Sequence, residues 1–351
     1  MDFKKIISYI FIYLSAIAIP AGFAQDKYPI PVIFDTDMGN DVDDALALYM
    51  LFKYEDMGKC RLLCVAHNKD NPKSVVATDI FASRIGRSPK YCAIAPGTGV
   101  SRNDGWYLRE LCEKKNPDAS PFYKRSIKEP ANAPESVSCL RKILAESDDN
   151  AVAYISVGFS TNLANLLKSK PDEISELSGR ELFAKKVKYV SIMAGDFSPE
   201  SLKNPAKAMK EFNVATDAES AGYAFENCPV PMYFSGFEFG SSITYPRSEI
   251  DSFFGEGHPI YEAYDTCSRK LHRRDGKFDW ATFDMTSVLF VFEPKYIKLS
   301  EPGKVSLFDK EGRIKFTPSK DGLHKYFLQI PDSNKEKIRS RIIELARVVN
   351  E

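Results

Sequence analysis

The sequence predicts an α/β fold with an open, mostly parallel sheet flanked by helices, and three observations lead to it. Short apolar runs rich in β-branched residues alternate with longer segments whose apolar residues recur at helical spacing. No internal repeat, low-complexity stretch or Gly/Ser/Pro-rich linker divides the chain. A length of 351 residues, 44% of them hydrophobic, is enough to bury a large core. We therefore expect one domain, over residues 25–351.

The N-terminal 24 residues have the pattern of a secretory signal peptide. A short basic start, with Lys4 and Lys5, precedes an apolar run over residues 6–19, and small residues lead up to Ala24. This is the pattern that signal peptidase cleaves, here after Ala24. The alternative is an uncleaved anchor, for which the apolar run is short. We therefore expect an exported protein, periplasmic or secreted, with no membrane segment after cleavage.

Strands and helices then follow one another in order. Residues 29–34 form a short apolar run typical of a buried strand, and residues 44–54 have apolar side chains at helical spacing. The same pairing recurs, with strands predicted over residues 61–67, 151–157, 187–193 and 230–234, and helices over residues 73–85, 162–168, 285–292 and from near 217. Strict alternation indicates a parallel sheet with helices on both faces. Residues 113–134, with four prolines and many charges, predict a long surface loop.

The charge balance excludes some classes of partner. The 48 Lys and Arg residues equal the 48 Asp and Glu residues, so the formal net charge is zero. A strongly basic nucleic-acid binder and a chain with an acidic disordered tail both depart from this balance. We therefore expect no nucleic acid partner.

The acids are nevertheless concentrated at one point. Residues 35–44, directly after the first predicted strand, hold five of the 48 acids. Like charges so close together raise one another's pKa, and a hard divalent cation such as Ca²⁺ or Mg²⁺ would keep them ionised. Gly39 permits the tight turn that brings the acids together. The alternative is an acidic helix start, in which Asp43 and Asp44 favour the helix dipole, but it accounts for only two of the five acids.

Three metal chemistries compete for this segment. An EF-hand loop requires Asp or Asn where Gly39 stands and Glu where Leu46 stands. A Mg²⁺ phosphatase of the haloacid-dehalogenase type also begins with a strand and Asp-x-Asp, but expects Thr or Val at the position of Gly39. The third candidate is the nucleoside hydrolase family. Its signature of Asp-x-Asp-x-Gly, followed by an Asp pair that opens a helix, closely resembles residues 35–48.

The resemblance to nucleoside hydrolases continues along the chain. Residues 157–164 are similar to the family's segment after a central strand, and residues 193–195 to its Met-Gly-Gly strand end. Residues 211–221 match its Glu-Phe-Asn block, and Asp284 resembles the late aspartate that completes the metal site. The resemblance implies the Rossmann-like nucleoside hydrolase fold.

The resemblance also implies roles for individual residues. One Ca²⁺ would be held by Asp37, Asp44, Asp284 and the backbone carbonyl of Val157. Asp37 would be the general base that takes a proton from the attacking water. The ribose hydroxyls would be bound by Asp43, Asn71, Asn204, Glu211 and Asn213. For the asparagines the alternative is a turn or cap position. Phe283 would stack on the base, with a place in the core as its alternative.

Three departures leave questions open. Two more residues than usual, Asp41 and Val42, separate Gly39 from the Asp pair, so the role of Asp41 as a ligand stays open. Phe283 stands where several family members carry the His that protonates the leaving base, and none of the four histidines is an obvious substitute. The seven cysteines show no CxxC or zinc-ligand spacing, and their pairing stays open.

We therefore predict Ca²⁺-dependent hydrolysis of the N-glycosidic bond of ribonucleosides. Two alternatives keep the fold: a non-catalytic ribose- or nucleoside-binding protein, and a hydrolase of another ribosyl compound. A Mg²⁺ phosphatase is the third. Family members often form dimers or tetramers, so the resemblance allows a homo-oligomer, and base preference stays open.

Overall fold

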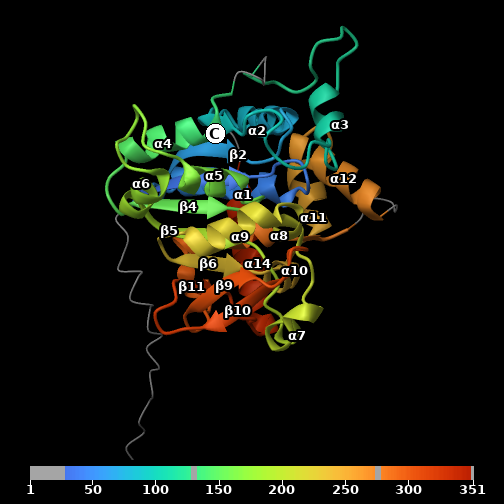
Figure 1. Cartoon of the computed structure of the whole chain (residues 1–351). Coiled ribbons are helices and arrows are strands. Elements are labelled where there is room, and N and C mark those ends of the chain that lie inside the picture. The colour runs from blue at the N-terminus through green and yellow to red at the C-terminus, as the bar shows by residue number, and fades with distance from the viewer. Residues whose placement is uncertain (1–27, 128–132, 273–277, 349–351) are drawn as a thin grey trace, which may run out of the picture.

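The first strand lies inside a nine-stranded sheet, which the computed structural model shows with helices on both faces (Figure 1). Residues 28–127, 133–272 and 278–348 are described, and the predicted signal peptide over residues 1–24 lies outside them. The strand order is β10-β9-β11-β6-β5-β4-β1-β2-β3. A separate two-stranded sheet pairs β7 (Thr244–Tyr245) with β8 (Trp280–Ala281).

Seven neighbouring strands of the large sheet run parallel. They are β3 (Tyr91–Ala93), β2 (Cys60–His67), β1 (Ile30–Thr36), β4 (Val152–Ser156), β5 (Val187–Met193), β6 (Met232–Ser235) and β11 (His324–Tyr326). The edge is antiparallel: β9 (Gly303–Leu307) pairs with β11 and with β10 (Ile314–Pro318). The sheet is mostly parallel, which confirms the predicted fold class.

The helices form one layer on each face of the sheet. One layer contains α1 (Asp43–Asp56), α2 (Lys73–Arg84), α13 (Phe283–Phe292) and α14 (Asp332–Ala346). The other contains α4 (Ser136–Glu146), α5 (Thr161–Lys168), α6 (Gly179–Lys186) and α9 (Ala218–Asn227). Each layer encloses its own apolar cluster against the sheet.

Further helices lie in the segments that connect these elements. These are α3 (Leu108–Glu113), α7 (Pro199–Lys203), α8 (Phe212–Thr216), α10 (Phe237–Ser241), α11 (Arg247–Glu249) and α12 (Pro259–His272). The described residues also form two short 3₁₀ helices, η2 (Pro205–Lys207) and η4 (Pro294–Tyr296), and one π-helix, η3 (Ile250–Phe254). No described helix has the length and apolar content needed to cross a membrane.

The first strand is apolar throughout because both of its faces are covered. Val32 and Phe34 pack into the cluster beneath α1, whereas Ile33 packs into the cluster on the opposite face. A strand buried on both faces has a continuous apolar run rather than an alternating one. Truncating a buried side chain such as Phe34 to alanine costs about 3–5 kcal/mol, so β1 is held firmly at the point where the acidic segment begins.

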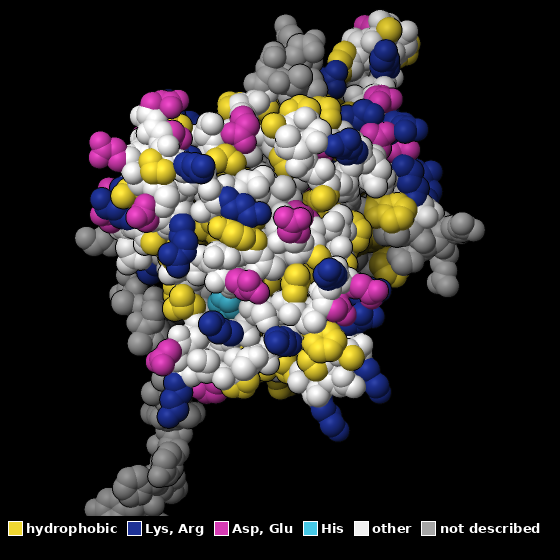
Figure 2. Space-filling model, in the orientation of Figure 1, with side chains coloured by type: hydrophobic (Ala, Val, Ile, Leu, Met, Phe, Trp, Pro, Cys, Tyr) yellow, Lys and Arg dark blue, Asp and Glu magenta, His cyan; other side chains and the backbone are white. Residues whose placement is uncertain are grey.

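The predicted elements lie close to their observed bounds, but the sequence analysis missed others. It predicted neither β3 nor α4, nor the three C-terminal strands β9, β10 and β11. Of the predicted loop over residues 113–134, the described residues 114–127 follow α3 and extend away from the body of the protein (Figure 1). On the face shown in Figure 2, acidic and basic side chains are intermixed.

Candidate functional site

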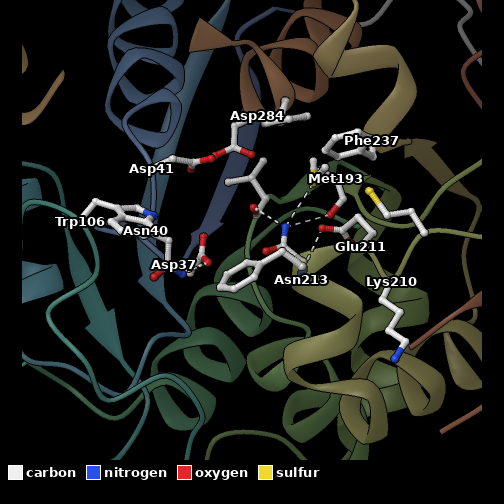
Figure 3. A pocket seen from close by; sticks show the side chains of 14 residues that line it. Asp37, Asn40, Asp41, Trp106, Met193, Lys210, Glu211, Asn213, Phe237 and Asp284 are labelled. Carbon is white, nitrogen blue, oxygen red and sulfur yellow. Dashed lines mark hydrogen bonds between the residues drawn. The ribbon is translucent and has the colours of Figure 1, made fainter. Parts of the chain in front are cut away.

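A pocket of about 340 Å³ opens at the carboxyl ends of β1, β4 and β5, where ligands bind in parallel α/β sheets. Its volume lies in the range of small-molecule sites. The polar side chains that line it are Asp37, Asn40, Asp41, Lys210, Glu211, Asn213 and Asp284. The aromatic ones are Trp106, Phe212, Phe237 and Phe283. The pocket lining therefore combines carboxylates with aromatic rings, and Figure 3 shows Trp106 and Phe237 on opposite sides of it.

Four carboxyl groups meet in this region, and we call them the acid quartet. They belong to Asp41, Asp43, Asp44 and Asp284, and one oxygen of each lies within 4.8 Å of the others. Asp41 directly precedes α1, Asp43 and Asp44 open α1, and the fourth acid comes from the first turn of α13. Figure 3 shows Asp41 and Asp284 pointing toward each other. The distant Asp284 thus completes a group that the local sequence begins.

Local contacts hold the quartet together. The backbone N–H of Asp284 donates a 2.9 Å hydrogen bond to Asp43 Oδ2, which ties α13 to α1. The hydroxyl of Thr36 donates to Asp44. Gly39 has a φ of +116°, which L side chains rarely adopt, and a Cβ there would lie 2.4 Å from the Leu108 side chain. The turn predicted at Gly39 therefore requires glycine for both its backbone conformation and its packing.

The quartet is short of positive charge and of hydrogen-bond donors. Asp43 Oδ1 and Asp44 Oδ2 are buried without a hydrogen-bond partner. Burial, and then the neighbouring acids, raise the pKa of Asp43, Asp44 and Asp284 well above the usual range. Buried carboxylate oxygens without a partner are costly, and oxygen ligands of this kind are what Ca²⁺ and Mg²⁺ prefer. The four side chains therefore fit a hard divalent cation.

Asp37 lies in the same pocket but outside the acid quartet. Its carboxylate accepts a hydrogen bond from the Asn40 amide, and Lys69 Nζ donates to Asn40 Oδ1 at 2.6 Å. Burial, followed by the charge of Asp41, raises the pKa of Asp37 to about 7. The end of β4 approaches closely: a Cβ on Gly158 would lie 2.5 Å from the backbone nitrogen of Asp37.

Asp35, the remaining acid of the segment, is fully buried under the pocket. It accepts hydrogen bonds from Tyr154 Oη at 2.7 Å, Asn162 Nδ2 at 2.8 Å and Asn68 Nδ2 at 3.0 Å. These partners come from β4, the start of α5 and the end of β2. Asp35 therefore joins the elements that position the site and does not line the pocket.

Glu211 and Asn213 line the pocket on the side of α8, as Figure 3 shows. Glu211 caps α8 by accepting from the backbone N–H groups of Asn213 at 2.7 Å and Val214 at 3.1 Å. Burial raises its pKa to about 7. Asn213 Nδ2 donates to the carbonyl oxygen of Val157 at 3.1 Å. The carbonyl predicted as a metal ligand thus lines the pocket and accepts a hydrogen bond from a predicted ribose-binding residue.

Asn71 and Asn204 do not line the pocket. Asn71 Nδ2 donates to the carbonyl of Asn103 at 2.9 Å, and its Oδ1 accepts from the backbone of Lys73 at 2.9 Å, at the start of α2. Asn204 is exposed and accepts from the backbone of Ala206 at 3.2 Å. The structure therefore places both asparagines in the turn and cap positions that were their alternative reading.

The aromatic residues of the pocket could be predicted only in part from the sequence. Phe283 lines the pocket and stacks on Phe237, with ring centroids 5.2 Å apart and an angle of 28° between the rings. Sequence reasoning missed Trp106, Phe212 and Phe237 as pocket residues. Phe212 had a signal, because it stands between Glu211 and Asn213 in the matched motif, whereas Trp106 had none.

The described histidine side chains lie elsewhere. His67, His258 and His324 are buried and do not line the pocket, and the side chain of His272 lies outside the described part of the chain. Burial lowers the pKa of His67 and His258 to about 3, so both stay neutral near pH 7.

Comparisons with known proteins identify the family of this chain and similar folds. The sequence profile of the inosine-uridine preferring nucleoside hydrolases matches residues 32–317. The fold is similar to a purine-preferring ribonucleoside hydrolase from Gardnerella vaginalis (14% identity, 91% of this chain and 100% of that chain, TM-score 0.66). It is also similar to an inosine-uridine preferring nucleoside hydrolase from Bacillus anthracis (14% identity, 90% and 99%, TM-score 0.62). No curated protein matched by sequence. Because the profile matches more than half of the chain, this protein belongs to the inosine-uridine preferring nucleoside hydrolase family.

Proposed function

We propose that the chain is a Ca²⁺-dependent hydrolase that cleaves the N-glycosidic bond of ribonucleosides to give free base and ribose. One observation carries the proposal. The acid quartet, with two buried carboxylate oxygens that lack a partner, lies beside a pocket lined by both polar groups and aromatic rings. A nucleoside has the matching parts, since its sugar is rich in hydroxyl groups and its base is flat and apolar on both faces.

The quartet would hold the cation through Asp41, Asp43, Asp44 and Asp284. Asp44 and Asp284 were predicted ligands, Asp43 was predicted to bind ribose, and Asp41 had been left open. Asp37 and the Val157 carbonyl, also predicted as ligands, line the same pocket. A hard divalent cation supplies, when bound, the positive charge that keeps these acids ionised and makes a nearby water more acidic.

Asp37 is the general base in this proposal. A base works best when its pKa is near the working pH, and burial places that of Asp37 at about 7. The hydrogen bond from Asn40 holds its carboxylate in one orientation. It takes a proton from water as the water oxygen bonds to C1′ and the bond between C1′ and the base nitrogen breaks. The base leaves with the electron pair of that bond and takes a proton from solvent.

The remaining pocket residues bind the two halves of the substrate. Glu211 and Asn213 bind ribose hydroxyls, and the carboxylates around the sugar stabilise the positive charge that develops on the ribosyl ring. Phe283 and Phe237 stack on the base. Neither phenyl ring can donate a proton to the leaving base.

Export is part of the proposal. The basic start and apolar run support removal of residues 1–24, which would place the enzyme in the periplasm or outside the cell. Expression of the full chain in a bacterial host, followed by N-terminal sequencing of the exported protein, tests this. A new N-terminus at Gln25 is expected, and an intact N-terminus retained in the membrane would contradict it.

A turnover assay tests the activity. Inosine, adenosine, uridine, cytidine and their 2′-deoxy forms are incubated with the protein in Ca²⁺ and, separately, in chelator. We expect release of base from ribonucleosides, loss of release with chelator and much weaker release from deoxy forms. Asp332→Asn, at a fully exposed position, is the matched control and keeps full activity. Tight nucleoside binding without turnover would favour the binding protein, and Mg²⁺-dependent phosphate release would favour the phosphatase.

A further inference from the structure

A second group of metal-ligating side chains lies away from the pocket. Cys64 of β2, Cys92 of β3 and Cys139 of α4 bring their sulfur atoms within 4.8 Å of one another. We call them the cysteine trio. None of the three lines the pocket. The seven cysteines all lie in the described residues and all are free thiols.

Three separate elements position the trio. β2 and β3 are adjacent parallel strands in which Ala66 pairs with Cys92, so Cys64 lies two residues along the neighbouring strand on the same face. α4 packs over both strands, as Figure 1 shows. A bridge between Ala93 and Glu135 fixes the start of α4 to the end of β3. The first turn of α4 then presents Cys139 to the two strand cysteines.

The sulfur separations suit coordination of a metal ion better than a disulfide. Cys64 Sγ and Cys92 Sγ are 3.4 Å apart, whereas a disulfide requires about 2.05 Å. Three sulfurs at about 2.3 Å from one tetrahedral metal ion lie about 3.8 Å from each other. In the trio the Cys64–Cys92 separation is 3.4 Å and no separation exceeds 4.8 Å, which is compatible with this value. Small side-chain rotations would therefore close the site around an ion.

The electrostatics favour a thiolate at the accessible end of the trio. Cys64 and Cys92 are fully buried, while Cys139 is half-buried and provides a route from solvent. The positive charges of Lys90 and Lys142 act on Cys139, and its place in the first turn of a helix also favours a thiolate over a thiol. The half-buried sulfur of Cys139 is therefore the first ligand that an entering ion would meet.

We propose that Cys64, Cys92 and Cys139 form a site for one thiophilic d¹⁰ cation, Zn²⁺ or a similar ion, bound by three sulfurs with a water at the solvent side. Binding releases the protons of Cys64 and Cys92 to solvent. Three thiolates and a divalent cation leave one net negative charge, which Lys90 and Lys142 offset. The trio offers sulfur alone and selects soft ions, whereas the acid quartet offers oxygen alone and selects hard ones.

Cadmium is the probe for the test, because its bonds to sulfur absorb in the ultraviolet and its bonds to oxygen do not. The reduced, metal-free full chain is titrated with Cd²⁺. We expect a sulfur-to-cadmium charge-transfer band that saturates at one ion per chain, is reversed by Zn²⁺ and is unaffected by Ca²⁺. Cys139→Ala should weaken Cd²⁺ binding by at least about tenfold. Its nucleoside hydrolysis should be unchanged, which separates this proposal from the proposed function.

Two controls show whether a change in the cadmium band is specific to the trio. Cys112→Ala removes a buried cysteine outside the trio and should leave the band intact. Circular dichroism confirms that each variant is folded. The proposal is overturned by a wild-type chain without the band or by an equal band in Cys139→Ala. A disulfide between two members of the trio, found by peptide mass mapping of protein prepared without reductant, would also overturn it.

Discussion

The acid quartet and the cysteine trio both gather metal-ligating groups at one point, but they are assembled differently. Three of the four quartet acids lie within four residues of one another in the sequence, directly after the turn at Gly39. The trio takes one residue from each of β2, β3 and α4. The charges differ too, because carboxylic acids ionise near pH 4 and thiols near pH 8.5. Without a bound cation, the negative charges of the quartet therefore destabilise the folded protein near neutral pH. The trio without an ion carries less charge and destabilises the fold less.

The largest expected effect comes from removing a quartet ligand. Asp284→Asn should abolish Ca²⁺ binding and lower kcat/KM by at least about a thousandfold, because ligand loss removes charge stabilisation from the whole site. Calorimetric titration with Ca²⁺ and the inosine assay measure the two effects. Cys139→Ala is the contrasting variant and should retain both. Equal loss in the two variants would mean that the two clusters do not act as separate sites.

The next variant distinguishes the general base from the metal ligands. Asp37→Asn should lower kcat by about 10²–10⁴, the usual contribution of a general base, while Ca²⁺ binding by the quartet persists. The measurement is steady-state kinetics beside calorimetry on the same preparation. Loss of Ca²⁺ binding in this variant would place Asp37 among the ligands, as the family resemblance implied.

The pH dependence of stability tests the cost of the buried acids in and around the quartet. Burial raises the pKa of Asp35, Asp37 and Glu211 to about 7, so the folded chain binds more protons than the unfolded chain between pH 4 and pH 7. Without Ca²⁺, the free energy of unfolding should therefore fall as pH rises through this window. Asp104, whose pKa is lowered to about 2, loses its contribution only below pH 4.

Calcium should oppose this loss because it binds the ionised acids. At pH 7, Ca²⁺ at a hundred times its Kd should add about 2.7 kcal/mol, or roughly 4 °C in Tm for a chain of this length, and at pH 5 much less. Thermal melts with Ca²⁺ or chelator at both pH values provide the comparison. An equal shift at pH 5 and pH 7 would show that the bound form does not require ionised acids.

The smallest expected effect comes from removing an aromatic side chain that lines the pocket. Phe283→Ala should raise KM by about three- to tenfold with little change in kcat, because ring stacking contributes about 0.5–1.5 kcal/mol to binding. Phe308→Ala, at a position 45% exposed outside the pocket, is the control. A fall in kcat alone, at unchanged KM, would instead assign Phe283 a part in the chemical step.

Much of the fold could be predicted because local pattern and burial agree. The predicted strand over residues 187–193 coincides with β5, and the predicted helix over residues 73–85 with α2, to within one residue. β3 was missed because its three residues are too short to show a period. The strands β9 to β11 were missed because their exposed edge carries many polar residues, so no apolar run marks them.

The residues of the candidate site were likewise predictable from the sequence only in part. The acidic segment was visible because five acids lie within ten residues, and Glu211 and Asn213 because they stand in one motif. Asn71 and Asn204 carried no local signal to distinguish a cap from a ligand, and the structure places both in capping hydrogen bonds. Trp106 and Phe237 reach the pocket only through packing of distant segments.

By itself the sequence determined the parallel α/β plan, the turn at Gly39 and the concentration of carboxylates after the first strand. These features depend on neighbours along the chain, where spacing is set by covalent geometry. Only the tertiary structure decided that Asp41 and Asp43 join Asp44 and Asp284, and that the three cysteines meet. Such meetings depend on how strands and helices pack across the sheet, and no spacing within the sequence records those distances.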